Sequence, residues 1–553
     1  MTATQDPPGA GVRKRAAGTV LDSRPVGWRF LVLVALLLVA AAGLPCAVGY
    51  LRAAPGETFL GFVDDWPDVL MYFSFAERAM RGELLTTVPC GTTEQRPRIL
   101  SGLSVAMGWV ARATGMEPPT AHLTARLLAA AVLVPVLALF FRGTVGNGAP
   151  LRFAVLSVAL GSGLGWVVGP VETSGWNPTD RWHIGTVALY AASTLAHLTV
   201  SWCLLLLTYH WLGCAVRTGS CRFAAAGGAA ICVNGLLHPY HFVSASVAAF
   251  ALTAWRAREA GWRRPGGVLL TFLATGCPAF LGQAWLTYSQ PVMRHVVEQS
   301  MNLSPHPLEY VLGFGVAGLL AAGALLDRRR IPSRQRVAVV WMVVCGALLY
   351  SYHTPLGVRF ERRFADVLVV PLMALGTRFL FGRVLPAIEA ARGRMAARLV
   401  VALLLVAQLP SNVLLVQRLC EKVKLGLRPY STPTAEVRAS RALRTLATDA
   451  DTVLSHVPAS LVIPALSGTA TVLSHPHWRP GHHQLQKRAV AEYWSEPSAA
   501  ARASFLREVG ATMVYIGQVE RELLKFAPAS DRSMVPIYER DGVAIYRIHS
   551  APR

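Results

Sequence analysis

Charged side chains are scarce in this sequence. Aspartate, glutamate, lysine and arginine together make up 15% of the 553 residues, whereas soluble domains carry about 25%. Hydrophobic residues make up 53%, and they gather in runs of about 20 residues, the length that a helix needs to cross a bilayer. The run over residues 31–50 is the clearest. This pattern excludes an ordinary soluble protein and predicts an α-helical polytopic membrane protein.

Paired cysteine motifs are also missing. The nine cysteines stand singly, without a Cys-x-x-Cys pair or a Cys/His spacing typical of zinc sites, so neither a zinc site nor a disulfide framework is predicted. The net charge of +22 would suggest nucleic acid in a soluble protein, but no basic helix with interleaved aromatic residues is present. The basic residues lie mostly in short loops between apolar runs, where they orient a membrane protein. We therefore expect no nucleic-acid partner.

The apolar runs predict about 11 transmembrane helices. The first run is too long for the apolar region of a signal peptide, and we interpret it as a retained signal anchor. With the N-terminal tail inside, the strongly basic segments 256–266 and 327–336 also fall inside, as the positive-inside rule requires. The predicted spans are 30–50, 122–141, 153–171, 184–215, 223–237, 241–255, 267–287, 308–326, 337–352, 366–381 and 399–418.

This topology divides the chain into regions. We expect a cytoplasmic tail at 1–29, a transmembrane domain at 30–418 with a first extracytoplasmic loop at 51–121, and an extracytoplasmic α/β domain at 419–553. The protein is then expected in the plasma (inner) membrane as a multi-pass protein, with its N-terminus cytoplasmic and its C-terminal domain extracytoplasmic.

The C-terminal region alternates short β-rich runs with amphipathic helical segments, which is typical of a small α/β unit. It has neither a glycine-rich phosphate loop nor a nucleophile elbow. We expect this unit to pack on the outer loops and cover a site, with binding of carbohydrate or peptide as the alternative.

Two adjacent carboxylates follow the first apolar run. Asp64 and Asp65 lie among aromatic and aliphatic residues, and Asp68 comes three positions later. Desolvation raises the pKa of a carboxyl group toward the range of a useful general base, and two neighbouring acids also repel each other. The alternative is that Asp65 only caps the helix predicted to follow, with Pro67 in its first turn.

An arginine group breaks the charge pattern of the outer loops. Arg359, Arg362 and Arg363 stand at the predicted outer end of a span, which the orientation rule disfavours. Because guanidinium groups bind phosphate bidentately, this group predicts a site for a lipid-linked phosphate or pyrophosphate. The alternatives are contact with ordinary anionic lipid headgroups and a salt bridge to Glu361.

The segment HPYH places His238 and His241 on either side of Pro239. Proline interrupts helices, so we expect a break between two spans here that places His238 or His241 in an outer cavity. Because no acid accompanies them in sequence, a metal site is disfavoured. Glu172 and Asp180, in another outer loop, are weaker candidates for the same cavity.

These features together resemble the GT-C class of membrane glycosyltransferases, which includes protein O-mannosyltransferases, the aminoarabinose transferase for lipid A and mycobacterial arabinosyltransferases. The segments GSGLGW (161–166), NGLLHPYHF (234–242), ALSGTATVLSHPHW and ATMVYIGQVER look like a bacterial branch of this class. The resemblance implies a polyprenyl-phosphate-linked sugar as donor, membrane lipid as surroundings and an extracytoplasmic glycan, lipid or protein as acceptor.

The resemblance also implies roles for residues. Asp65 or Asp64 would act as general base, and Arg359, Arg362 and Arg363 would hold the donor phosphate. No cofactor is certain, because some members of the class need a divalent cation and others do not; Asp64 with Asp65 could supply its ligands.

Two other functions stay open. A transporter for a lipid or glycan should carry charges near the membrane midplane and repeated halves, and the sequence has few of the former and no evident repeat. A non-catalytic GT-C-like scaffold or sensor would use its outer domain to bind a partner. The observation that discriminates between these functions is whether Asp64 and Asp65, the arginine group and HPYH converge on one outer cavity. If they lie far apart, the enzyme hypothesis loses its main support.

Overall fold

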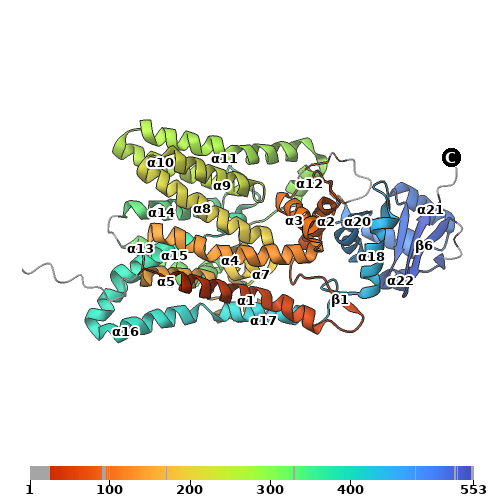
Figure 1. Cartoon of the computed structure of the whole chain (residues 1–553), viewed down its shortest axis with the longest axis horizontal. Coiled ribbons are helices and arrows are strands. Elements are labelled where there is room, and N and C mark those ends of the chain that lie inside the picture. The colour runs from red at the N-terminus through yellow and green to blue at the C-terminus, as the bar shows by residue number, and fades with distance from the viewer. Residues whose placement is uncertain are drawn as a thin grey trace, which may run out of the picture.

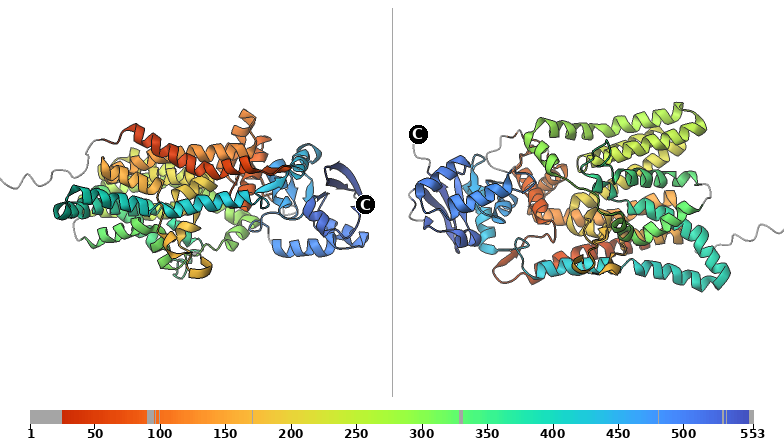
Figure 2. Two further views of the ribbon diagram at one scale, coloured as in Figure 1. Left: turned by 90° about the horizontal axis from the view of Figure 1, so that it is seen from below. Right: turned by 180° about the vertical axis from the view of Figure 1, so that it is seen from behind.

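The computed structural model describes residues 25–89, 95, 97–98, 100–169, 171–327, 331–479, 481–528, 531 and 533–549. A bundle of helices fills one end of the molecule, and an α/β unit built from the C-terminal part of the chain fills the other (Figure 1). The two further views show the same separation along the long axis (Figure 2).

Long apolar helices form the bundle. In the described part of the chain, six helical segments are long and apolar enough to cross a membrane, so the chain is a helical membrane protein. The count of about 11 spans stays a prediction. The six segments are α1 (Trp28–Arg52), α4 (Pro118–Thr144), α8 (Ala196–Thr218), α11 (Arg263–Ser289), α13 (Pro307–Leu326) and the continuous stretch Glu361–Lys424.

Further helices complete the bundle. His238 and Pro239 lie between α9 and α10, and Tyr240 and His241 begin α10, so the predicted break at Pro239 is confirmed. The remaining helices of the bundle are α5 (Ala149–Ala159), α7 (Ala188–Thr194), α9 (Cys221–Gly235), α10 (Tyr240–Ala260), α12 (Pro291–Gln299) and α14 (Arg336–Leu348), and the stretch Glu361–Lys424 contains α15 (Val369–Phe379), α16 (Leu385–Ala407) and α17 (Pro410–Lys424).

Three predicted spans are wrong as single helices. The span 153–171 contains only the end of α5, which stops at Ala159, and then a short 3-10 helix at Gly165–Val168. The span 184–215 is divided into α7 and α8, because Leu195 has an extended backbone (φ −127°, ψ 120°). The span 399–418 is divided into α16 and α17 because Pro410, which has no backbone N–H, starts a new helix. Helix α17 then runs alongside α1 and past the predicted domain boundary at 419 (Figures 1 and 2).

The first loop is largely helical. It contains β1 (Glu57–Phe59), α2 (Trp66–Met80) and α3 (Gly102–Thr114). Apolar residues of α2 recur at helical spacing, among them Val69, Leu70 and Phe73, and all three are buried. Gly108 lets α3 approach α2 closely, since a Cβ atom there would lie 2.3 Å from a backbone oxygen of α2.

A five-stranded mixed sheet forms the centre of the α/β unit, in the order β4-β3-β5-β7-β6. Strand β3 (Thr452–Leu454) pairs in parallel with β4 (Ala470–Thr471) and β5 (Met513–Ile516), while β7 (Val543–Ile548) is antiparallel to β5 and β6 (Met534–Arg540). The helices of the unit are α18 (Thr434–Leu446), α19 (Ala459–Ser467), α20 (His482–Ala489), α21 (Ala499–Glu508) and α22 (Gln518–Leu523).

The strand that precedes this sheet in the chain pairs with the first loop instead of joining the sheet. β2 (Ser431–Pro433) pairs antiparallel with β1 of the first loop, from Glu57↔Pro433 to Phe59↔Ser431. The connection between the bundle and the α/β unit is therefore fastened to the loop that carries the candidate acids.

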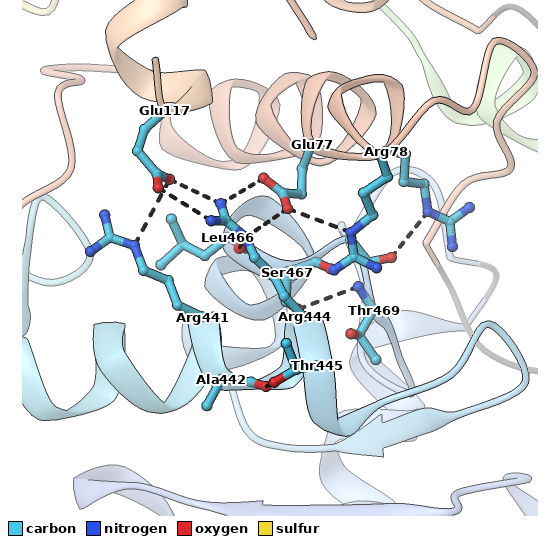
Figure 3. A network of polar contacts seen from close by, with 12 residues as sticks. Glu77, Arg78, Glu117, Arg441, Ala442, Arg444, Thr445, Leu466, Ser467 and Thr469 are labelled. Atoms are coloured by element: carbon cyan, nitrogen blue, oxygen red, sulfur yellow. Dashed lines mark hydrogen bonds and ion pairs between the residues drawn. The ribbon is translucent and has the colours of Figure 1, made fainter. Parts of the chain in front are cut away.

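An ion network centred on the buried Glu77 also holds the α/β unit on α2 (Figure 3). Arg444 of α18 lies between Glu77 of α2 and Glu117 at the start of α4: its Nε is 2.7 Å from Glu77 Oε1, and its Nη2 is 2.9 Å from Glu117 Oε2. The Glu77 side chain is fully buried, and Nε of Arg81, the residue that caps the C-terminus of α2, lies 3.6 Å from Glu77 Oε1. We call Glu77, Arg81, Glu117 and Arg444 the seam.

Two arginines, one in the last turn of α2 and one at its C-cap, add contacts to the carboxyl end of α19. Arg78 Nε donates to Gly468 O at 3.0 Å, and Arg81 donates to Ser467 O. Cations stabilise the last carbonyl groups of a helix because these carry the negative end of its dipole. Helix α2 is thus attached to the α/β unit over its C-terminal half.

Candidate functional site

Asp64 is held by groups from two distant helices. Tyr190 of α7 donates its hydroxyl hydrogen to Oδ2 at 2.7 Å, and Lys422 of α17 lies 2.5 Å from Oδ1. Arg418 donates in turn to the Tyr190 hydroxyl at 3.0 Å. Burial opposes the charge of Asp64, but Lys422 and Tyr190 outweigh it, so the pKa of this carboxyl lies below its ordinary value. Asp64 is a fixed, ionised side chain.

Asp65 differs from its neighbour. It occupies the N-cap position of α2 in the left-handed region (φ 49°, ψ 44°), yet its side chain makes no capping hydrogen bond. Asp65 thus stands at the predicted N-cap position with Pro67 in the first turn, but its carboxylate does not cap the helix. Burial, together with repulsion by Asp68 and Asp64, raises the pKa of Asp65 to about 7, although Arg363 and Lys422 act against the rise. A left-handed backbone at a residue other than glycine is strained, and such strain gathers at functional sites.

Asp68 lies one helical turn from Asp65 and faces the α/β unit. Its Oδ1 is 2.9 Å from His475 Nε2, in the segment that follows β4, and 37% of its side chain stays exposed. Burial would raise the pKa of Asp68, but His475 and the more distant Arg363 and His197 lower it below its ordinary value. A second charged carboxylate therefore stands beside Asp65.

The three arginines of the predicted phosphate site have different surroundings and do not form one group. Arg359 is exposed and donates to a backbone oxygen at Glu298 (3.1 Å). Arg362 donates to Asn302 Oδ1 at 2.5 Å and stacks over the Trp182 ring. Arg363 alone is close enough to both Asp65 and Asp68 to lower the pKa of each.

Glu361 is not the partner of these arginines. Its Oε1 accepts from the Ser304 backbone N–H at 2.9 Å, and its Oε2 accepts from that of Tyr352 at 2.8 Å. Among the described residues no ion pair joins Glu361 to Arg359, Arg362 or Arg363, so the salt-bridge interpretation is wrong.

A chain of rings links HPYH to the first loop. The His238 ring centroid lies 5.1 Å from that of His197, which lies 4.7 Å from that of Tyr72 on α2. His238 Nδ1 is 2.7 Å from the Tyr240 hydroxyl, and that hydroxyl donates to Asp366 Oδ2 at 3.4 Å. Histidine, tyrosine and first-loop acids thus meet at one place.

Asp366 lies behind Arg363 in the same region. This buried carboxylate is 3.0 Å from His183 Nε2 and 3.8 Å from His241 Nε2. Gly185 leaves room for it, since a Cβ atom there would lie 1.9 Å from Asp366 Oδ1. His241 therefore supports Asp366 from within the protein instead of facing an open site.

Glu172 and Asp180 do not join this group. Glu172 is exposed in the four-residue helix α6 (Val171–Ser174), while Asp180 is buried and accepts from the Gly165 backbone N–H at 3.1 Å. Within the described ranges, neither side chain has a hydrogen bond or an ion pair with Asp65, Arg363 or HPYH. The expectation that either one serves as a further site acid gains no support from its placement.

Sequence reasoning missed Tyr190, Lys422, Asp366 and His475. Asp366 follows Arg363 by three positions and His475 begins the motif HPHW, so both lay in segments already singled out.

A divalent cation was left open by the sequence. The described part of the chain contains no group of three or more histidine, cysteine, aspartate or glutamate side chains placed to hold a metal ion.

Comparison with known proteins identifies the fold. No protein-family model and no curated protein matches the chain. The apo oligosaccharyltransferase of Archaeoglobus fulgidus is similar in structure, with a TM-score of 0.54 and 12% identity over 88% of this chain and 69% of that chain. The A. fulgidus oligosaccharyltransferase AglB, in complex with an inhibitory peptide and a dolichol-phosphate, gives 0.51 and 12% over 88% and 70%.

The mycobacterial arabinofuranosyltransferase AftD gives a TM-score of 0.54 and 16% identity over 96% of this chain and 42% of that chain. These proteins are GT-C glycosyltransferases, so the resemblance found in the sequence is confirmed at the level of the fold. The chain therefore has the fold of a GT-C-type membrane glycosyltransferase.

Proposed function

We propose that this protein transfers a sugar from a polyprenyl-phosphate donor to an acceptor hydroxyl at the extracytoplasmic face of the membrane. One observation carries the proposal: the charge of Arg363 acts on both Asp65 and Asp68, and in the described part of the chain neither Asp65 nor Arg363 has a side-chain hydrogen bond or ion pair of its own. A carboxylate with a pKa of about 7 and a guanidinium that is free to bind an anion are the two groups that this reaction needs.

The chemistry follows from these two groups. Asp65 accepts the proton of the acceptor hydroxyl as its oxygen forms a bond to the anomeric carbon of the donor sugar. The bond between that carbon and the phosphate oxygen breaks, and its electron pair passes to the phosphate, whose charge Arg363 neutralises. Asp65 then releases its proton to water. Positioning and electrostatic stabilisation supply most of the rate in such a step.

Asp64 has a separate role in this proposal. Because Lys422 and Tyr190 occupy both of its oxygens, it is a poor proton acceptor. Its fixed negative charge instead raises the pKa of Asp65 and so makes Asp65 a stronger base.

The arrangement of the bundle supports the extracytoplasmic placement. The α10–α11 junction and α16 lie at the end of the molecule opposite the α/β unit (Figure 1). These elements include basic residues such as Arg263, Arg264 and Arg398, and the positive-inside rule assigns that end to the cytoplasm. The α/β unit and the first-loop acids would then lie outside, where a lipid-linked donor and an external acceptor can meet.

Convergence favours an enzyme over the two other functions. First-loop acids, one arginine and HPYH meet at one place, whereas a scaffold that only binds a partner has no need of this arrangement. The dolichol-phosphate and peptide held by a protein of the same fold also support a lipid-phosphate donor.

A turnover assay tests the proposal. Purified protein in lipid nanodiscs is incubated with radiolabelled polyprenyl-phosphate sugars and a panel of glycan, lipid and peptide acceptors, and released polyprenyl phosphate is measured. We expect Asp65→Asn to lose turnover by about 100-fold or more, Asp64→Asn to lose less, and the exposed control Asp449→Asn to match wild type. Full activity of Asp65→Asn would contradict the proposed base.

A further inference from the structure

The α/β unit places one buried histidine against the candidate acids. His475 is almost fully buried, and its Nε2 lies 2.9 Å from Asp68 Oδ1. It belongs to a tight turn in which the Trp478 backbone N–H donates to His475 O at 3.0 Å. The Trp478 ring packs edge-on against Phe75 of α2, with 6.0 Å between centroids. The turn is therefore seated on the helix that carries Asp68.

A backbone contact selects the tautomer of His475. The backbone N–H of His477 donates to His475 Nδ1 at 3.1 Å, so this nitrogen accepts and the proton of the neutral imidazole sits on Nε2. The neutral ring thus carries its proton on the nitrogen that lies 2.9 Å from Asp68 Oδ1. A proton on that side of the ring favours the ionised form of Asp68.

We propose that His475 is a positioning residue for the candidate base: it keeps Asp68 ionised and directed toward Asp65, so that the α/β unit completes the site from outside the bundle. This inference rests on the proposed function, since it concerns the same base. It does not require His475 to touch a substrate.

The seam explains how the unit stays in place. Arg444 bridges Glu77 and Glu117, and Glu77 stands on α2, nine residues after Asp68. His475 and the seam thus fasten the two halves of one helix to the same unit.

Several charged and titratable groups face the two acids. Apart from each other, Asp65 and Asp68 are surrounded by Asp64, Tyr72, Tyr190, His197, Arg363, Lys422, Tyr430 and His475. His475 itself faces Asp68, His477 and His482. Of these groups only His475, His477 and His482 belong to the α/β unit, so variants of His475 isolate its contribution.

The test compares wild type with His475→Ala, His475→Gln, Asp68→Asn and His483→Ala in nanodiscs. Gln keeps an N–H donor at a similar reach, and His483 is an exposed histidine of the same unit. Two quantities are measured: the pH dependence of transfer, and the titration of ¹³C-labelled aspartate carboxyl groups, with Asp65→Asn used to assign the Asp65 signal. The second measurement needs no donor or acceptor.

We expect the Asp65 titration and the acid limb of the rate profile in His475→Ala to move to lower pH by at least about half a unit, because repulsion from Asp68 weakens. The maximal rate should fall about three- to tenfold, as expected for a weaker general base. Asp68→Asn should shift both measurements in the same direction, while His475→Gln should restore most of each and His483→Ala should match wild type.

Each outcome decides one claim. An unchanged Asp65 titration in His475→Ala would overturn the inference and leave the proposed function standing. If wild type shows no turnover but Asp65 still titrates near pH 7 and moves in His475→Ala, the coupling holds and the proposed function fails. A lower rate without any shift in titration would mean that His475 acts only through folding.

Discussion

Removing Arg444 tests the seam most directly. Its guanidinium contacts two carboxylates, and Glu77 is fully buried, so Arg444→Met leaves a charge inside the protein with less compensation. Breaking a buried ion pair from one side costs about 3–5 kcal/mol. Arg444 is 24% exposed and Arg81 remains 3.6 Å from Glu77, so we expect the lower end, about 3 kcal/mol.

The same helix offers a matched control. Arg441 Nε lies 3.9 Å from Glu117 Oε2, and their side chains are 41% and 38% exposed. Exposed pairs contribute little, so Arg441→Met should cost below about 0.5 kcal/mol. Native-state hydrogen exchange of α18 and α19, measured by mass spectrometry, gives the free energy of opening for each variant.

The cost should also depend on pH. Burial and repulsion by Glu117 already hold the pKa of Glu77 above its ordinary value, against the opposing effect of Arg444, so the loss of Arg444 raises it further. The destabilisation is then fully present above that pKa and shrinks as pH falls, because protonation removes the buried charge. Equal costs for Arg444→Met and Arg441→Met, or a cost that grows toward low pH, would refute this reasoning.

Three further results are expected. The rate of transfer should fall about tenfold per pH unit below about pH 7, because Asp65 must be ionised to accept a proton. A rate that does not fall in this pH range would exclude Asp65 as the base. Arg363→Lys should raise the KM for the donor about tenfold, since an ammonium cannot bind phosphate bidentately. The control Arg507→Lys, on the exposed face of α21, should leave this KM unchanged. A KM of Arg363→Lys equal to that of wild type would remove Arg363 from the donor site. Gly108→Ala should lower stability in thermal unfolding by about 2 kcal/mol, because its Cβ would meet α2 at 2.3 Å, while Gly102→Ala, with no atom within 4 Å, should be tolerated.

Much of the bundle could be predicted because membrane spans leave a strong local signal. Residues 31–50 lie within α1, and the break at HPYH follows from Pro239. The predicted span 184–215 failed at Leu195, an apolar residue whose extended backbone has no signature in composition. Hydropathy records which residues avoid water and does not record where a helix is interrupted.

The site was only partly predictable for a different reason. The acids and the arginine group were found from their local surroundings, but the choice between Asp64 and Asp65 depends on Lys422, which is 358 residues from Asp64 in the chain. Likewise, no spacing rule connects His475 to Asp68. Side chains that meet only after folding leave no local pattern, so the sequence identified the candidates and the structure distinguished their surroundings.

The short pairing of β1 with β2 has a consequence for how the protein is made. Its two strands are separated by more than 370 residues, since Thr58 Oγ1 contacts Thr434 Oγ1 across 376 positions. During synthesis, β1 of the first loop therefore has no partner strand until the chain has been made as far as residues 431–433. Contacts of such long range form late in folding. The first loop would thus gain its partner strand only when residues 431–433 have been made, so a chain that ends before them would lack this pairing even if its spans were inserted.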